Sequence, residues 1–542
     1  MPEFAALPAT APLDGSSARS MDIPIHSTPN SSLRVFEIYE LVVLICELLS
    51  RRDNASLLCV CHQLSRVVRP FVWERIDTVE PLVRMIPGTC VDVYGDEPFR
   101  PFITMSLPKS LDLARLSFYA PYIKYLDIPL TTTIDAYENW DQFLASTRTT
   151  DLLPNLQHLK LIFTWRTNEE TIIGDTLKWV TAFLSSSLLS LEIYPDFGWN
   201  ASIHRFGHAF IGLDRATQLL HALSEKCSRL SSLAILPGDI TTHSSMWLDT
   251  TTYGAGAEVV PASAIFHKEH IRLDLIFPRF EYLRDLSATP SILESRVFRA
   301  LGDLAYLETL SIRGFPITDL QGNCYKVASN LELTAHSFPA LRHLDLLNLH
   351  YKVVINICRH KPLARALRRL RPINWWSTGR QRHTELLDSL IEHDSAIDQL
   401  DLFHLLPRWF ITPRFLRCLS YLQLTHLSIP QPVHRRFEYD WNELARAVPV
   451  LKSLELTEWI TYEPLEFERL WDIAIALPNL SHLSGCFQYW KTSSPDEFQH
   501  DFFPQSLEPF CLELSLHRNF GRRSVDLDRT ARLLGTLSGR NQ

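Results

Sequence analysis

Apolar residues recur along most of the chain in a triplet spaced i, i+3, i+5, with polar residues between them. Leu156, Leu159 and Leu161 form one copy, and full copies start at residues 123, 156, 188, 230, 307, 341, 397, 424 and 451. The last two apolar residues of each triplet alternate with a polar one, as on a strand with one buried face, and the first lies at the turn that enters the strand. The pattern predicts a strand at each copy, with side chains such as Lys160 facing outward.

Amphipathic stretches separate the triplets and are predicted to form helices. They cover residues 176–184, 216–223, 293–301, 383–391 and 467–476. Repetition of one strand-and-helix unit is typical of a solenoid, in which each unit packs on its neighbours. A βα barrel also alternates strands and helices and stays open as an alternative, although a barrel has no reason to repeat one triplet in the same local register. The predicted fold class is α/β, with an irregular solenoid carrying insertions over residues 79–535.

A different pattern precedes the repeats, at residues 33–78. Two sets of apolar residues there have helical spacing: Leu41, Ile45 and Leu48, then Leu57, Cys61, Leu64 and Val68. The polar residues between the sets predict a turn, with Asp53 as the N-cap of the second helix, and Pro70 is expected to end that helix. So small a helical module rarely has a self-sufficient core, so we expect its apolar ridges to need a partner or the following domain.

Composition indicates a folded chain: of 542 residues, 46% are hydrophobic and 21% charged. The net charge of -8 predicts no general attraction to nucleic acid or to an anionic membrane. Residues 1–32, rich in Pro, Ala, Ser and Thr, are expected to form a flexible tail, as are residues 536–542. With scattered cysteines, no apolar stretch long enough for a membrane span and no secretory signal pattern, we expect a cytoplasmic or nuclear location and no membrane partner.

Motifs for catalysis or cofactor binding were not found in the sequence. We see no nucleophile elbow, phosphate-binding loop, dinucleotide fingerprint or zinc-protease motif. The pairs His204/His208 and Cys59/Cys61 have spacings that a metal could use, but each lacks further ligands nearby. We therefore predict no enzyme, no metal and no cofactor.

The helical module carries a specific set of residues. Ile38, Glu40 and Leu41 come first, then Ile45, Leu48, Leu49, Arg52, Asp53, Leu57, Leu58, Val60, Cys61 and Leu64, and finally Pro70 and Trp73. In this arrangement residues 35–77 resemble an F-box, except that Ile38 or Tyr39 stands where the family has proline. The triplets resemble leucine-rich repeats, although the Asn or Cys of the strict repeat is mostly missing. An F-box followed by leucine-rich repeats is a familiar domain order.

The resemblance implies a substrate receptor of an SCF-type cullin-RING ubiquitin ligase, which carries out no chemistry itself. Its F-box would dock on a Skp-type adaptor, and through it on a cullin, while the repeats would bind an unidentified protein target. The expected adaptor-binding residues are Ile38, Leu41, Ile45, Leu48, Leu49, Leu57, Val60, Cys61, Leu64 and Trp73. The alternative is a repeat scaffold outside any ligase, whose N-terminal helices cap the first repeat.

One stretch suggests how a target could be recognised. Residues 359–382 carry eight Lys and Arg and no acidic residue. The candidate substrate-binding residues within it are Arg365, Arg368, Arg369, Arg371, Trp375 and Trp376. Arginines beside planar rings would suit a phosphorylated or acidic segment. The other interpretation is a solvated helix or an inserted loop, because the stretch falls in the long gap between the triplets at 341 and 397.

Overall fold

The computed structural model describes most of the repeat region and the helices before it. The described residues are 38–94, 102–108, 112–129, 133–138, 140–147, 150–163, 170–195, 211–238, 272–313, 333–347, 349, 351–373, 382–402, 412–430, 440–457, 465–466, 469–485, 487–488 and 511–514. The chain divides into two compact units, Met1–Trp73 and Glu74–Gln542. The tails expected at residues 1–32 and 536–542 lie outside the described residues, as does the pair His204/His208.

The first unit is a three-helix module. Its helices are α1 (Tyr39–Leu48), α2 (Arg51–Leu57) and α3 (His62–Trp73). Val42 and Cys46 of α1 pack against Leu64 and Val68 of α3, and all four side chains are buried. The side-chain amide of Asn54 on α2 donates to the carbonyl of Cys46 at 2.9 Å, which ties α2 to the end of α1.

Two local predictions for this unit were wrong. The polar residues 50–54 begin a helix instead of forming a turn, because Ser50 is its N-cap: its hydroxyl accepts the Asp53 N–H at 3.3 Å. Pro70 lies inside α3 and does not end it. A proline removes one hydrogen bond from the helix, but Val68 and Phe71 on either side of it both pack in the core of the unit.

The second unit is built on an open parallel sheet. Among the described residues it has fourteen strands, in the order β1 (Arg75–Ile76), β4 (Tyr125–Pro129), β6 (His158–Phe163), β7 (Ser190–Pro195), β9 (Ser232–Ala234), β11 (Asp285–Ala288), β12 (Thr309–Arg313), β13 (His343–Leu347), β14 (Arg369–Ile373), β15 (Gln399–Asp401), β16 (His426–Pro430), β17 (Ser453–Thr457), β19 (His482–Gly485) and β21 (Cys511–Leu514). Each strand pairs in parallel with the next. The strands β1 and β21 are the two edges, so the barrel alternative was wrong.

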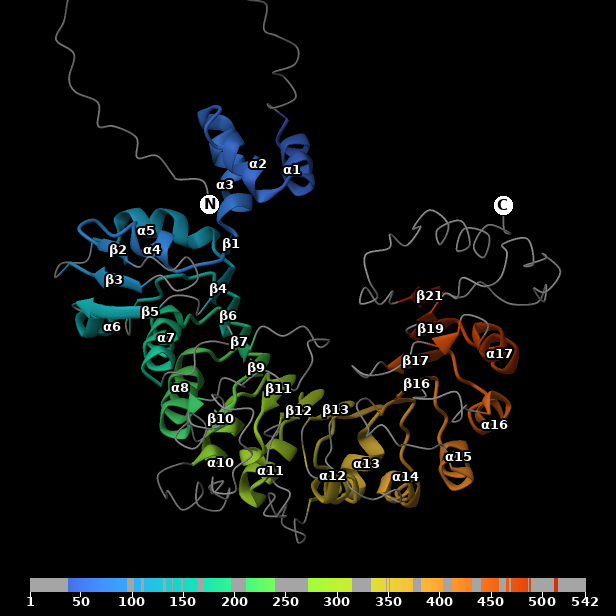
Figure 1. Cartoon of the computed structure of the whole chain (residues 1–542). Helices are drawn as coiled ribbons and strands as arrows, with labels where there is room; N and C mark the ends of the chain where they lie inside the picture. Colours follow the sequence, from blue (N-terminus) through green and yellow to red (C-terminus); the bar gives the residue numbers. More distant parts are fainter. Residues whose placement is uncertain are drawn as a thin grey trace, which may run out of the picture. The chain divides into compact units, whose positions relative to one another are not determined.

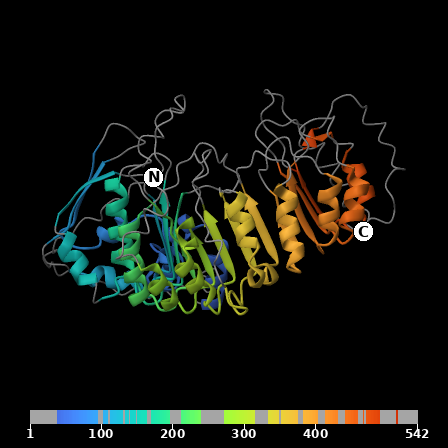
Figure 2. The ribbon, with the colours of Figure 1, turned by 90° about the horizontal axis from the view of Figure 1, so that it is seen from below.

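Helices connect most neighbouring strands. They are α4 (Glu80–Val83), α5 (Ala114–Tyr119), α6 (Trp140–Thr147), α7 (Glu170–Phe183), α8 (Leu213–Lys226), α10 (Leu273–Ile276), α11 (Ser295–Gly302), α12 (Tyr351–Cys358), α13 (Lys361–Ala366), α14 (Arg382–Glu392), α15 (Pro413–Ser420), α16 (Trp441–Ala447) and α17 (Arg469–Ala476), with 3-10 turns at Ala120–Tyr122, Phe277–Arg279 and Pro290–Leu293. From α7 onward they lie on one side of the sheet (Figures 1 and 2). None of the described helices is long and apolar enough to cross a membrane.

The triplet prediction was confirmed strand by strand. The second apolar residue of each copy stands in register with that of the next, as in Leu126, Leu159 and Leu191. These leucines and the third apolar residues are buried on the helix side of the sheet. At each strand entry one carbonyl accepts two N–H groups of the following repeat: that of Lys124 accepts from Gln157 and His158, both at 2.9 Å. The same paired bond recurs at every junction down to the carbonyl of Lys452, which places successive repeats in one register.

One repeat escaped the sequence analysis. Strand β14 fills the gap that was interpreted as an insertion, and Leu370 on it pairs with Leu344 and Leu400 in the common register. Its third apolar position is Pro372, so the triplet did not match the pattern.

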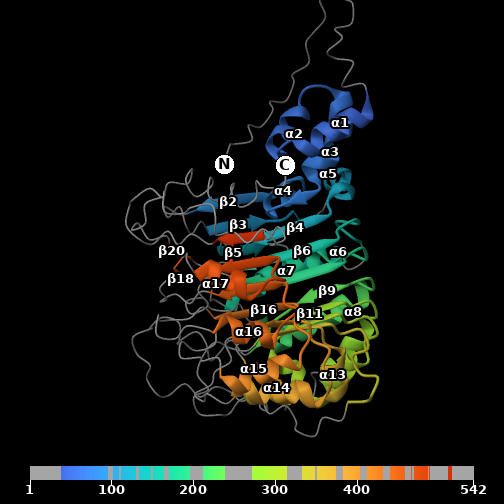
Figure 3. The same cartoon turned by 90° about the vertical axis from the view of Figure 1, so that its right-hand side faces the viewer.

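A three-stranded sheet of β2 (Cys90–Tyr94), β3 (Phe102–Ser106) and β5 (Thr133–Glu138) lies near β4 (Figure 3). Two short pairs, β8 (Ile211–Gly212) with β10 (Pro237–Gly238) and β18 (Leu465–Glu466) with β20 (Phe487–Gln488), complete the described strands.

Candidate interaction surfaces

The α1 helix is apolar on two sides. Val42 and Cys46 face the core, whereas Leu41, Leu44 and Leu48 are 38%, 54% and 88% exposed. The spacing of these three leucines is i, i+3, i+7, so they share one face of the helix. An exposed leucine row on a helix is unfavourable in water, and such a patch is typical of a surface that binds another protein.

The residues predicted to bind an adaptor therefore divide into three groups. Five are exposed, four are half-buried, and one is in the core. Ile38, Leu41, Leu48, Val60 and Cys61 are exposed; Ile45, Leu49, Leu57 and Trp73 are half-buried; Leu64 is 2% exposed. Leu64 supports the module from inside and does not present a contact surface.

Sequence reasoning missed Leu44, which lies at the centre of the exposed row. Its spacing from Leu41 and Leu48 was a usable signal, but Ile45 fits a helical period equally well. Tyr39, placed in the sequence only as a substitute for proline, is 62% exposed next to Ile38. We call Ile38, Leu41, Leu44, Leu48 and Val60 the apolar surface of the first unit.

In the described part of the basic stretch, the candidate arginines divide between two places. Arg365 on α13 donates to the carbonyl of His393 at 3.3 Å and pairs with Asp394 at 3.2 Å. Arg368, at the entry to β14, donates to the carbonyl of Ala396 at 3.1 Å. Both side chains therefore contact the segment that follows α14, whereas Trp375 and Trp376 lie outside the described residues.

Arg369 and Arg371 lie instead on the strand face of the sheet, opposite the buried leucines. Both Nε and Nη2 of Arg369 donate to one carboxylate oxygen of Asp401, at 3.1 and 2.7 Å. Nε of Arg371 lies 3.9 Å from the same oxygen. The two arginines are thus partly neutralised by an aspartate on the neighbouring strand, which is distant in sequence.

Two further carboxyl groups, those of Asp345 and Glu455, interact with these charges, and we call Asp345, Arg369, Arg371, Asp401 and Glu455 the strand-face cluster. Burial raises the pKa of Asp345, while Arg371 and Arg369 oppose that rise. Glu455 keeps part of its side chain in solvent, yet desolvation by its neighbours, followed by the charge of Asp401, raises its pKa. Sequence reasoning missed these acidic residues because each comes from a different repeat and only the register brings them together.

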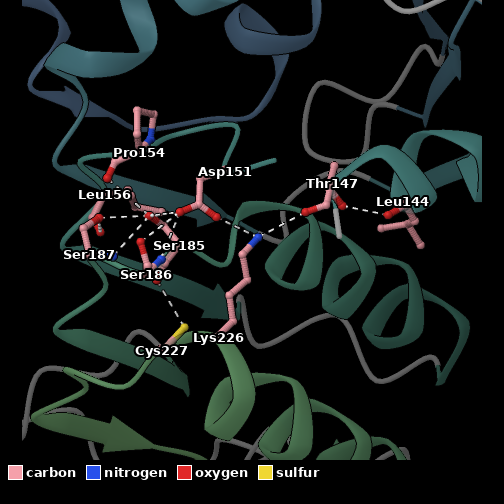
Figure 4. A network of polar contacts seen from close by, with 10 residues as sticks. All are labelled: Leu144, Thr147, Asp151, Pro154, Leu156, Ser185, Ser186, Ser187, Lys226 and Cys227. Atoms are coloured by element: carbon pink, nitrogen blue, oxygen red, sulfur yellow. Dashed lines mark hydrogen bonds and ion pairs between the residues drawn. The ribbon is translucent and has the colours of Figure 1, made fainter. Parts of the chain in front are cut away.

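A second polar network lies where three connections meet (Figure 4). Asp151 accepts from the ammonium of Lys226 at 2.9 Å and from both the N–H and the hydroxyl of Ser186, at 3.2 and 3.0 Å. Lys226 also donates to the carbonyl of Thr147 at 3.1 Å. Burial raises the pKa of the Cys227 thiol to about 12, so this group stays protonated and is a poor nucleophile. We interpret the network as structural, because it joins the end of α6, the turn before β7 and the end of α8.

Among the described residues, no three His, Cys, Asp or Glu side chains are placed to hold a metal ion. No protein-family model matches the chain, and no curated protein matches it.

Proposed function

We propose that this chain is the substrate-recognition subunit of an SCF-type cullin-RING ubiquitin ligase. In this proposal the first unit is an F-box-like module that docks on a Skp-type adaptor and through it on a cullin. The second unit is a leucine-rich-repeat solenoid that binds the protein target. The receptor positions its target and carries out no catalysis. The observation that carries the proposal is the row of exposed leucines on α1, backed by a separate apolar core.

In the first unit, one set of apolar residues forms the core and another is exposed, and this separation supports docking. The core of the unit is already formed by four buried side chains, those of Val42, Cys46, Leu64 and Val68. The core therefore does not need Leu41, Leu44 and Leu48. Three leucines spaced i, i+3, i+7 fit a groove of another protein in the way that amphipathic helices bind. Burying one such side chain contributes about 1.5–3 kcal/mol.

The repeats supply a rigid support for target recognition. Shared registers and paired junction hydrogen bonds fix the strand face, which presents Arg369 and Arg371. We propose that these two arginines contact the target. Arg365, Arg368, Trp375 and Trp376 complete the candidate set taken from the sequence. The first two would contribute from α13 and from the entry to β14, where they contact the segment after α14.

Co-purification of the full chain with a Skp-type adaptor tests the proposal. The double variant Leu44→Lys, Leu48→Lys should lose the adaptor while keeping its circular dichroism spectrum and melting temperature. Leu275→Lys is a matched control, because Leu275 is 54% exposed, as Leu44 is, but lies on α10 of the second unit. Substituting Leu64 would be uninformative, since a lysine there would disrupt the core.

The alternative is a repeat scaffold that acts outside any ligase. In that case the wild-type chain would be well folded and would not bind the adaptor. If the helices served only as a cap, the double variant would lower the melting temperature of the whole chain. Either result would contradict the receptor proposal.

A further inference from the structure

Alternate residues of the six consecutive strands β12 to β17 form one face of the sheet, opposite the helices. Leu344 and Leu346 of β13 point to the helix side and are buried, so His343 and Asp345 point to the opposite face. The same alternation places Arg313, Arg369, Arg371, Asp401 and Glu455 on that face. Arg369, Arg371 and Asp401 act electrostatically on both Asp345 and Glu455, and Arg313 acts on Asp345, so the six charged residues form one group on paired strands.

The charges of this group are segregated along the sheet. Strands β12 to β14 present three arginines against one aspartate, Asp345. Strands β15 to β17 present Asp401 and Glu455 and no Lys or Arg. The face is therefore positive at one end and negative at the other, although its charges cancel as a whole.

The boundary between the two ends is the pair of Arg369 and Asp401. Their side chains are 36% and 12% exposed, so the arginine remains open to solvent while the aspartate is largely covered. Beyond the pair, Glu455 makes no ion pair with any described residue. An acidic group can thus approach Arg369 and Arg371, and a basic group can approach Glu455.

We infer that this face binds a segment of the target protein in which acidic and basic residues are grouped separately. The acidic group would lie over Arg369 and Arg371 and the basic group over Asp401 and Glu455. Neighbouring strands are about 4.8 Å apart, so β14 and β17 are separated by about 14 Å, which four residues of extended chain can span. A uniformly acidic segment fits less well, because it would meet Asp401 and Glu455.

The inference rests on the proposed function in one respect: that function identifies the ligand as a segment of the target protein. The adaptor would bind the apolar surface of the first unit, so loss of adaptor binding and loss of peptide binding are separate results. Peptide binding by the full chain can therefore be measured whether or not the adaptor binds.

The test uses two labelled peptides of twelve residues with identical composition: four Glu, four Lys and four Ser. One groups the Glu and the Lys in separate blocks, and the other alternates them, so both have no net charge. Fluorescence anisotropy at low salt should show about fivefold tighter binding of the grouped peptide, as expected for two or three exposed ion pairs, and the difference should shrink at high salt.

Charge reversal locates the effect. Glu455→Lys should abolish the preference for the grouped peptide. Glu192→Lys makes the same charge change on β7, in the same row of the sheet, and should leave the preference intact. Equal or undetectable binding of the two peptides, or loss of the preference in both variants, would overturn the inference.

Discussion

The imidazole of His383, near the start of α14, is 9% exposed. Burial lowers its pKa from 6.5 to about 4, because the charged form is poorly solvated there. The unfolded chain therefore takes up a proton at a higher pH than the folded chain. The stabilisation is complete above about pH 6.5 and is lost as the pH falls toward 4.

We expect the free energy of unfolding to fall by up to about 2 kcal/mol more in the wild type than in His383→Gln between pH 7.5 and pH 5. Urea unfolding of both chains at the two pH values measures this difference. His158 and His360 also have pKa values lowered by burial, so only the difference between the chains isolates His383. His426→Gln, at an exposed position, is the control and should behave as wild type. Parallel pH dependence of wild type and His383→Gln would show that this histidine has no such role.

Connections between helices and strands are held by the Asp151 network. Burial acts to raise the pKa of Asp151, but hydrogen bonds from Lys226 and Ser186 together lower it below its usual value. Its carboxylate therefore stabilises the folded state above the unfolded pKa of about 4, and this contribution is lost as the pH falls through the lower folded value.

Lys226→Met should lower the free energy of unfolding by about 1–2 kcal/mol at pH 7 and should move the onset of acid unfolding to higher pH. Lys452→Met, at an exposed position, is the control for urea unfolding at pH 7 and pH 4; equal stability of the two variants would contradict this account.

Elements differ in how far the sequence predicts them. The triplets predicted their strands well, because burial of one face of a strand places its apolar residues at every second position. The helices were recognisable because apolar residues recur on one side of each. Strand β14 was missed because Pro372 replaces its third apolar residue. The α2 helix was missed because its residues are mostly polar and its N-cap, Ser50, competed with Asp53 as a capping residue.

The interaction surfaces were only partly predictable for a related reason. Exposed and buried positions on α1 alternate within an almost wholly apolar sequence, so periodicity alone could not tell Leu44 from Ile45. The strand-face cluster joins Asp345, Arg371 and Glu455 from separate repeats. Which residues meet in the cluster depends on the register between strands. That register includes β14, whose repeat the sequence pattern did not predict.

At the scale of the whole molecule, the two units have separate roles in the proposed function. The first has a small closed core and an exposed leucine row, and the second has a polar strand face on a long parallel sheet. Docking at one unit and target selection at the other do not require a shared residue. Variants of the apolar surface and of the strand-face cluster change different residues in different units, so we expect their effects on binding to be additive.

Hydrogen–deuterium exchange of the full chain, with and without a Skp-type adaptor, tests the central claim most directly. The account predicts that the adaptor slows exchange in residues 38–73, most strongly along α1, and leaves the strands β12 to β17 unchanged. Unchanged exchange throughout the chain, or slowing confined to the repeats, would contradict it.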